Sequence, residues 1–152
     1  MPSSWTQNFY HLVFSTKHRE PFISEELETR LHPFLGGIVR DHRCTPIAIN
    51  GMADHVHLLV RYRSDLSHSD LVRHAKFRST NWVRAEFSEL KRFAWQEGGG
   101  GFTVSKSLVA RVESYIQNQK EHHRTLTFKE EFLELLRLHG VEFDEAEVFP
   151  EG

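Results

Sequence analysis

The sequence predicts an α+β fold in which helices pack on an antiparallel β-sheet. Runs of aromatic and β-branched residues that suit strands alternate along the chain with segments whose apolar residues recur at helical spacing. Two of the strand-like runs, 45–50 and 55–62, are separated only by the turn-like segment Gly51–Asp54, which is typical of an antiparallel hairpin. The predicted order is strand, helix, two strands, helix, two strands and two helices, which fits an α+β sandwich.

The first strand and the first helix follow from local composition. Residues 9–16 are rich in aromatic and branched side chains and predict a strand, and the basic loop Lys17-His18-Arg19 comes next. Ser24 is suited to cap a helix, whose buried stripe would be Leu27, Leu31, Leu35, Ile38 and Val39. Because Pro33 and Gly36-Gly37 lie within this helix, we expect a kink or a break into two pieces.

The elements after the hairpin are predicted from helical and alternating patterns. We expect a helix at 67–87, short strands at 93–96 and 102–104, and helices at 105–123 and 128–139. Ser105 can cap the helix at 105–123, and Gly140 is placed to end the last helix. The consecutive glycines Gly98–Gly101 form either a flexible hairpin or a hinge that moves the helix after them.

The composition predicts one globular domain, residues 1–152, in the cytoplasm. Hydrophobic residues make up 39% of the 152 positions and twelve of them are phenylalanines, enough for a single packed core. Cys44 is the only cysteine of the sequence, so an internal disulfide is excluded and a reducing compartment is expected. The chain has no long apolar run, and Met1-Pro-Ser-Ser does not resemble a signal peptide, so we expect no membrane contact.

Charge is distributed unevenly along the chain. The net charge is −2, yet residues 1–129 hold 18 basic against 13 acidic side chains, whereas residues 130–152 hold only Arg137 against eight acids. Phosphate binding depends on local cations rather than on the total, so the first segment can still bind nucleic acid. We expect residues 130–152 to form a C-terminal helix and a solvated acidic tail, and competition with DNA for the basic face is a weaker alternative. The scattered apolar residues of the tail, Val141, Phe143, Val148 and Phe149, could instead pack or bind a partner.

His55 and His57 are the most informative residues of the sequence. They lie two positions apart in the predicted strand 55–62, so their side chains project from the same face of the sheet. Two imidazoles held side by side can form half of a divalent-metal site. For an isolated pair of this kind, a solvated sheet face is the more frequent explanation. Asp54 could orient a histidine or the ion, or could simply belong to the turn.

Tyr115 and Gln119 offer the second half of such a site. They lie four positions apart on the predicted helix 105–123, so they share one face at a separation of about 6 Å. Two histidines and an amide oxygen would leave positions on the ion open for a phosphate oxygen. A nearby cation would also stabilise the phenolate of Tyr115, which is otherwise a weak nucleophile. Together the residues indicate phosphoryl transfer through a phosphotyrosine, although Tyr115 alone would be read as a core aromatic.

These motifs resemble one known protein family in their order along the chain. The segments Asp54-His-Val-His-Leu-Leu, Phe93-Ala-Trp-Gln96 and Tyr115-Ile-Gln-Asn-Gln119-Lys-Glu-His-His123 are similar to those of the single-tyrosine HUH transposases of small bacterial insertion sequences, which include the REP-associated tyrosine transposases. The resemblance runs from about residue 8 to about residue 148. It implies a ferredoxin-like sheet with the histidine strand near its centre. The aromatic residue that the family usually has in the glycine stretch is absent here.

The resemblance also implies an activity and a set of site residues. His55, His57 and Gln119 would bind Mg²⁺ or Mn²⁺, and Tyr115 would attack a phosphate of single-stranded DNA to leave a 5′-phosphotyrosine and a free 3′-hydroxyl. Attack by another 3′-hydroxyl would reseal the strand, so this HUH endonuclease and strand transferase would need no ATP. The family acts on DNA hairpins. A homodimer is expected, in which the tyrosine helix of one chain could complete the site of the other.

Basic residues near these motifs are candidate contacts to the DNA backbone. They are Lys17, Arg19, Arg73, Lys76, Arg78, Lys106 and Arg111. Three other functions are conceivable. A replication initiator or relaxase would share the chemistry, but it usually carries a second tyrosine or a third histidine at defined spacing and a helicase domain, for which this chain is too short. A generic hydrolase would need further His or Asp ligands. A related protein could bind hairpins without cutting them.

Overall fold

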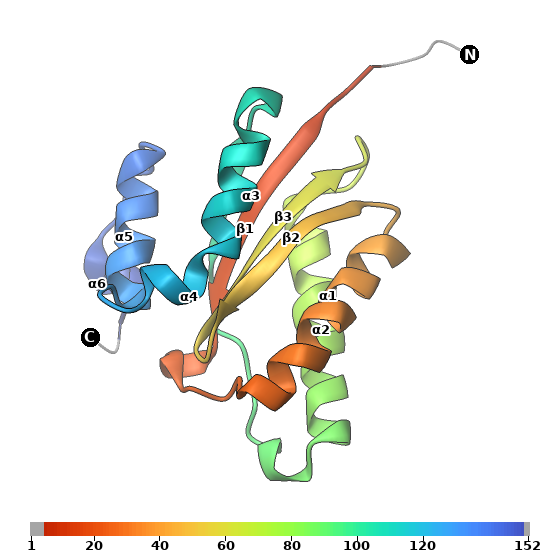
Figure 1. Ribbon diagram of the computed structural model, residues 1–152, viewed down its shortest axis with the longest axis vertical. Coiled ribbons are helices and arrows are strands. Elements are labelled where there is room, and N and C mark those ends of the chain that lie inside the picture. Colours follow the sequence, from red (N-terminus) through yellow and green to blue (C-terminus); the bar gives the residue numbers. More distant parts are fainter. Residues whose placement is uncertain (1–4, 151–152) are drawn as a thin grey trace.

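The structure is a computed structural model that describes residues 5–150, and within them one four-stranded sheet forms the centre of the fold (Figure 1). The expectation for Met1-Pro-Ser-Ser therefore lies outside the described residues. The strands are β1 (Asn8–Ser15), β2 (Thr45–Met52), β3 (His55–Tyr62) and β4 (Gly100–Val104). Their order is β2-β3-β1-β4 with antiparallel neighbours, which is the predicted ferredoxin-like arrangement with the histidine strand at its centre.

Helices cover both faces of the sheet (Figure 1). One face packs on α1 (Glu25–Asp41) and α2 (His68–Glu86), and the other on α3 (Val109–Gln117) and α5 (Phe128–Leu138). Two short helices, α4 (Gln119–His122) and α6 (Glu145–Val148), adjoin α5. Side chains alternate along β3, so Val56, Leu58 and Val60 enter the core under α1 and α2. His55 and His57, which alternate with these residues, face α3 and α5.

Two predicted helix-end signals, Ser24 and Gly140, act as expected, whereas the Ser105 side chain makes no capping hydrogen bond with any described residue. The side chain of Ser24 accepts a hydrogen bond from the Leu27 amide at the start of α1. Thr127 and Glu130 form a reciprocal capping box at the start of α5. Gly140, with φ +66°, lets the amides of Gly140 and Val141 bond back to the last carbonyls of α5.

The helix around Pro33 differs from the prediction. α1 runs as one helix from Glu25 to Asp41, with Pro33 inside it, so the expected break into two pieces does not occur. Its buried stripe packs in the core beneath the sheet on both sides of Pro33 and keeps the two halves in one helix. This packing outweighs the loss of one backbone hydrogen bond at the proline.

The segments around the glycines and Tyr115 also differ from the prediction. Residues 93–96 form no strand within the described chain, and the segment contributes only a bridge between Trp95 and Thr16. The expected helix 105–123 is divided into a short 3-10 turn (Lys106–Leu108), α3 and α4. Asn118 has a backbone ψ of 17° and separates the last two.

The glycine stretch is tightly packed rather than a loose hairpin. Gly100 and Gly101 pair with β1 as part of β4. A β-carbon on Gly101 would lie 2.3 Å from the His68 ring, and one on Gly99 would lie 2.9 Å from a carbonyl oxygen of β1. The glycines therefore allow close packing, and Gly99 also adopts φ +143°.

The apolar residues of the C-terminal segment pack against the body of the protein, which agrees with one of the two alternatives for this segment and not with a fully solvated tail. Phe149 is only 4% exposed and contacts Phe132 of α5. The guanidinium of Arg19 lies 4.8 Å from the centre of the Phe149 ring. Apolar residues in the acidic segment thus tie it to the sheet side of α5. Each helix within residues 5–150 is too short or too polar to cross a membrane.

Candidate active site

The central strands direct a group of histidines toward α3 and α5. His55 and His57 lie on the same face of β3 and are both fully buried. β1 pairs with β3 and adds His11, which is 3% exposed, beside His57. Alternation along the strands therefore brings these imidazoles together, as the spacing of His55 and His57 predicted. His11 was missed because its partner lies 46 positions away in the sequence.

Each imidazole of β3 is held through its Nδ1 atom. His55 Nδ1 donates to Asp54 Oδ1 at 2.7 Å, and His57 Nδ1 lies 2.8 Å from His11 Nε2. Asp54 therefore has the orienting contact that the sequence suggested as one alternative. These contacts direct the Nε2 atoms of both β3 histidines away from the strand and toward α5.

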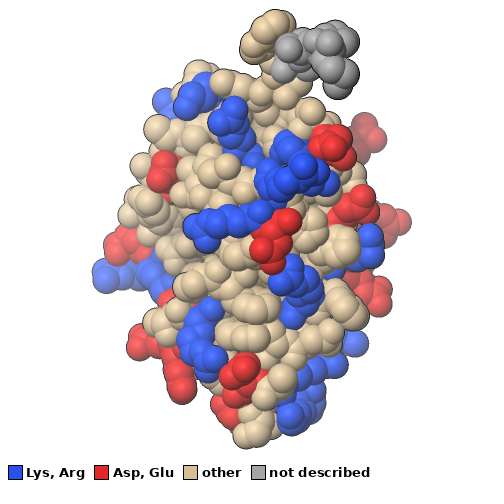
Figure 2. Space-filling view, turned by 90° about the vertical axis from the view of Figure 1, so that its right-hand side faces the viewer, with Lys and Arg blue, Asp and Glu red and all other residues tan. Residues whose placement is uncertain are grey.

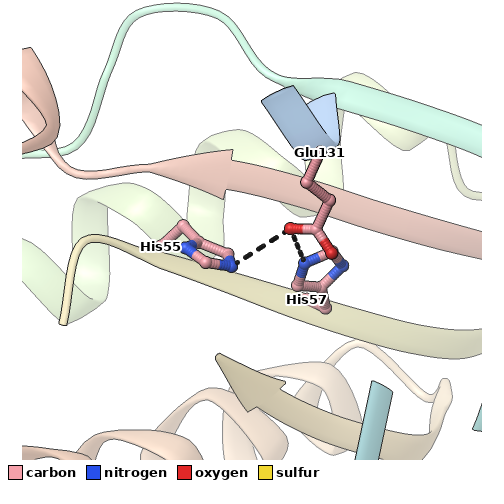
Figure 3. Close-up of side chains that lie close together, drawn as sticks. All are labelled: His55, His57 and Glu131. Atoms are coloured by element: carbon pink, nitrogen blue, oxygen red, sulfur yellow. Dashed lines mark hydrogen bonds and ion pairs between the residues drawn. The ribbon is translucent and has the colours of Figure 1, made fainter. Parts of the chain in front are cut away.

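Glu131 of α5 is the residue that meets these histidines (Figure 3). Its side chain is 1% exposed, and its Oε1 atom lies 3.4 Å from His55 Nε2 and 3.1 Å from His57 Nε2. Within the described chain these three residues form a group that could hold a metal ion. Sequence reasoning missed Glu131. The available signal was its place among buried apolar residues of α5, because an acid on such a stripe needs a buried partner.

A further histidine joins the cluster. His123, which follows α4, is 5% exposed, and its Nε2 atom lies 2.9 Å from the same Glu131 oxygen. Its Nδ1 atom donates to the Leu126 carbonyl at 2.6 Å. The predicted ligands did not include His123, although it belongs to the motif that begins at Tyr115.

Tyr115 and Gln119 reach the other oxygen of Glu131. The Tyr115 hydroxyl donates a short hydrogen bond to Glu131 Oε2, and Gln119 Nε2 donates to the same atom at 2.7 Å. Gln119 Oε1 lies 2.9 Å from His55 Nε2. Asn50 of β2 donates to the carbonyls of Ile116 and Gln117, which anchors the break between α3 and α4 beside the cluster. A single chain therefore brings the predicted ligands His55, His57 and Gln119 together with the predicted nucleophile, Tyr115.

Burial and mutual contacts shift the pKa values in this cluster. Burial alone would lower the pKa of His55, but its hydrogen bonds with Asp54 and Glu131 raise it to about 9. Burial lowers the pKa of His57 to about 4 despite its contact with Glu131. Burial raises the pKa of Tyr115, and the Glu131 carboxylate raises it further, so the phenol is protonated at neutral pH.

Burial opposes ionisation of Glu131, but its hydrogen bonds with histidines outweigh this and hold its pKa far below the usual range. Glu131 is therefore an anion at neutral pH. A buried carboxylate that faces several imidazoles gives the centre the charge and the donor atoms of a divalent-metal site.

The predicted DNA contacts lie in several places. Arg73 and Lys76 line an open groove of about 770 Å³ between α2 and residues 94–100. Lys17 and Arg19 line a second groove of about 600 Å³ beside α5 and α6, and both grooves share residues 96–99. Arg78 instead pairs with Asp41 of α1 at 3.0 Å.

The other two candidates lie around α3. Lys106 Nζ lies 6.0 Å from the centre of the Phe9 ring, and Arg111 is exposed. The face formed by α1 and α2 carries many Lys and Arg side chains interspersed with acids (Figure 2). Positive charge is therefore spread over several surfaces rather than gathered in one patch.

Known sequences match most of this chain. The sequence profile described as "Transposase IS200 like" matches residues 4–119. The ISDra2 transposase TnpA of Deinococcus radiodurans is 28% identical over 120 residues, which cover 74% of this chain and 84% of that protein. The transposase for insertion sequence element IS200 of Salmonella typhimurium is 26% identical over 120 residues, covering 76% and 78%.

Solved structures agree with these matches. The crystal structure of a putative transposase from Deinococcus radiodurans has a TM-score of 0.66 and 27% identity, and the match covers 78% of this chain and 95% of that one. A REP-associated tyrosine transposase bound to a REP hairpin has a TM-score of 0.61 and 15% identity over 81% and 73% of the two chains, which supports the fold alone. The chain belongs to the IS200-like transposase family, as its motifs predicted.

Proposed function

We propose that the protein is a metal-dependent transposase that nicks and rejoins single-stranded DNA through a 5′-phosphotyrosine on Tyr115. One observation carries this proposal. A single carboxylate, Glu131, accepts the hydrogen bond of the Tyr115 hydroxyl through one oxygen and meets His55 and His57 through the other. Glu131 thus holds the phenol beside the atoms that would bind the metal, where a bound ion could activate it.

The donor atoms fit a divalent ion, which we propose to be Mg²⁺ or Mn²⁺. The distances from Glu131 Oε1 to His55 Nε2 and His57 Nε2, 3.4 and 3.1 Å, are comparable to those between neighbouring ligands with bonds of about 2.1 Å. Gln119, the ligand implied by the resemblance, fits as well because its Oε1 atom lies 2.9 Å from His55 Nε2. A bound ion would polarise the scissile phosphate and stabilise the phenolate.

The residues of the chain have distinct roles in this proposal. Asp54 and His11 hold the imidazoles of His55 and His57, and Glu131 positions the phenol of Tyr115. In the cleavage step the Tyr115 phenol loses its proton, its oxygen forms a bond to phosphorus, and the bond from phosphorus to the 3′-oxygen breaks. The departing 3′-oxygen takes up a proton. Attack by another 3′-hydroxyl reverses the step and restores a phosphodiester, so no energy source is consumed.

The proposed substrate is single-stranded DNA that carries hairpins. The groove beside α2 supports it, because Arg73, Lys76 and the exposed ring of Phe77 line this groove. Cations can bind phosphates while an aromatic ring stacks on an unpaired base. The solved relative bound to a REP hairpin points to the same class of ligand. Lys76 also donates to the carbonyls of Gln96 and Gly98, so it links α2 to residues 94–100 on the other side of the groove.

The alternative is a protein that binds DNA hairpins without cutting them. The raised pKa of Tyr115 favours this alternative, since a phenol that stays protonated is a weak nucleophile. We also propose a homodimer in the cytoplasm, with residues 1–152 as one transposase domain.

A covalent adduct separates these functions. Purified protein is mixed with a labelled library of single-stranded DNA hairpins and Mg²⁺ or Mn²⁺, and the products are run on a denaturing gel. We expect a protein–DNA adduct in the wild type and in Tyr62→Phe, whose hydroxyl lies in the opposite core, but none in Tyr115→Phe. Hairpin binding without any adduct would establish the alternative.

A further inference from the structure

We propose that His123 is a third imidazole ligand of this metal centre, so that the centre prefers a first-row transition-metal dication such as Mn²⁺ to Mg²⁺. The inference rests on the proposed metal-dependent function and narrows the identity of the ion. The family profile ends at residue 119, so neither His123 nor Glu131 lies in the matched segment. The ligand set implied by the resemblance, His55, His57 and Gln119, does not include His123.

The geometry places three Nε2 atoms around one oxygen. Glu131 Oε1 lies 2.9 Å from His123 Nε2, 3.1 Å from His57 Nε2 and 3.4 Å from His55 Nε2. The rings of His55 and His123 are 4.6 Å apart between centres. An oxygen atom can accept hydrogen bonds along only two lone-pair directions, so three nitrogens around it favour a cation at this point. The ligand atoms of His55, His57 and Glu131 already lie within 4.8 Å of one another. His123 Nε2, which meets them at Glu131 Oε1, would move toward a bound ion to complete the set.

The Nδ1 contacts show which nitrogen of His123 is free to bind a metal. The Leu126 carbonyl can only accept, so His123 Nδ1 carries the hydrogen in the bond of 2.6 Å between them. In the neutral imidazole the Nε2 lone pair then points at Glu131, and a proton or a cation must lie between the two atoms. His55 is held in the same way by Asp54. A histidine fixed by an acceptor at one nitrogen is the usual form of a metal ligand.

The donor set decides which ions fit. Mg²⁺ binds oxygen ligands and keeps several waters, and it seldom occupies sites made of imidazoles. Transition-metal dications accept imidazole nitrogen more readily. Three nitrogens and one carboxylate oxygen, all nearly inaccessible to solvent, therefore favour a transition-metal ion over Mg²⁺.

Pulsed electron paramagnetic resonance of the Mn²⁺-loaded full chain counts the nitrogen atoms bound to the ion. We expect three in the wild type and two in His123→Gln. In calorimetric titrations His123→Gln should bind Mn²⁺ at least about tenfold more weakly, because even outer partners of ligands contribute that much to affinity. The matched control is His42→Gln, whose imidazole also contacts a carbonyl through Nδ1, at 2.8 Å, but follows α1 on the opposite face of the sheet. Its affinity should not change.

The wild-type measurement decides the proposal even if a variant folds poorly. Two bound nitrogens in the wild type would overturn it, and so would Mg²⁺ affinity equal to Mn²⁺ affinity. Unchanged Mn²⁺ affinity in a His123→Gln protein that keeps its metal-free melting temperature would also overturn it. The adduct assay with Tyr115→Phe tests the proposed function separately, since three nitrogens can be counted whether or not DNA is cleaved.

Discussion

His11 Nε2 and His57 Nδ1 lie 2.8 Å apart at the centre of the sheet, and both side chains are almost completely buried. Antiparallel pairing of β1 with β3 produces this contact, because it sets Val13 opposite His57 and leaves His11 on the same face. The contact occupies one nitrogen of His57 and leaves the other to face Glu131. His11 is therefore a positioning residue for the candidate metal centre.

Replacing His11 should weaken metal binding without removing a ligand. We expect His11→Phe to bind Mn²⁺ about 10- to 100-fold more weakly, because the ring of His57 loses the partner that orients it. Calorimetric titration measures this, with Tyr10→Phe as a control on the opposite face of the same strand. A His11→Phe protein that folds and binds Mn²⁺ normally would show that the neighbouring imidazole has no part in orienting His57.

Glu131→Gln should affect both the metal and the stability of the metal-free protein. The amide is a poorer ligand than the carboxylate, and the surrounding histidines lose a charged acceptor. We expect at least about tenfold weaker Mn²⁺ binding and a loss of about 1–3 kcal/mol in the free energy of unfolding. Glu134→Gln is the matched control, since Glu134 lies on α5 but is exposed. Equal effects of both variants on Mn²⁺ affinity would contradict a ligand role for Glu131.

Two arginines of α2 should differ in their effect on DNA binding. Within residues 5–150, Arg73 lines the groove and makes an exposed ion pair with Asp70, whereas Arg78 pairs with Asp41 of α1 and is not among the residues that line the groove. We expect Arg73→Ala to lower the affinity for single-stranded hairpin DNA. The slope of the logarithm of the binding constant against the logarithm of the salt concentration should become shallower by about 0.7 for each phosphate contact that is lost. Arg78→Ala should have little effect. Fluorescence anisotropy at several salt concentrations measures both, and a reversed order would place the DNA on another surface.

The relation between subunits can be tested by mixing inactive chains. Within one chain Tyr115 already reaches Glu131, and its ring lies 5.9 Å from that of His57. If the tyrosine acts in the chain that holds it, a mixture of His57→Ala and Tyr115→Phe chains should form no adduct, and this is the outcome we expect. Restored cleavage would instead show that sites are shared across a homodimer.

Local sequence patterns predicted the parts of the site that depend on local geometry. Strand alternation brought His55 and His57 to one face, and helical spacing brought Tyr115 toward Gln119 even though Asn118 divides the helix. Glu131 was missed because its contact with His57 spans 74 positions, and such a distance leaves no periodic signal.

Burial explains the other errors. The acidic tail was expected mainly in solvent, yet its Phe149 packs on Phe132 of α5 in the core beside β1. Apolar burial of a few side chains thus decided the place of a segment whose average composition is polar. In the same way, packing of α1 on the sheet overrode the tendency of Pro33 to break a helix.

His32 should make the protein less stable in mild acid. Its side chain on α1 is 13% exposed, and its Nε2 atom has no hydrogen-bond partner among the described residues. Burial lowers the pKa of His32 to about 4; the nearby Glu28 opposes this shift and Lys120 adds to it. In the unfolded chain the pKa is about 6.5, so between these values the unfolded state binds more protons than the folded state.

Stability should therefore fall as pH falls from about 6.5 to about 4, by at most about 1.4 kcal/mol per pH unit from this residue. Above that range His32 is neutral in both states and contributes no slope. The variant His32→Gln cannot take up a proton, so its free energy of unfolding should decline less between pH 7 and pH 4.5 than that of the wild type. Urea denaturation at several pH values measures the difference. Parallel curves for the two proteins would mean that the folded protein accommodates a charged imidazole at this position.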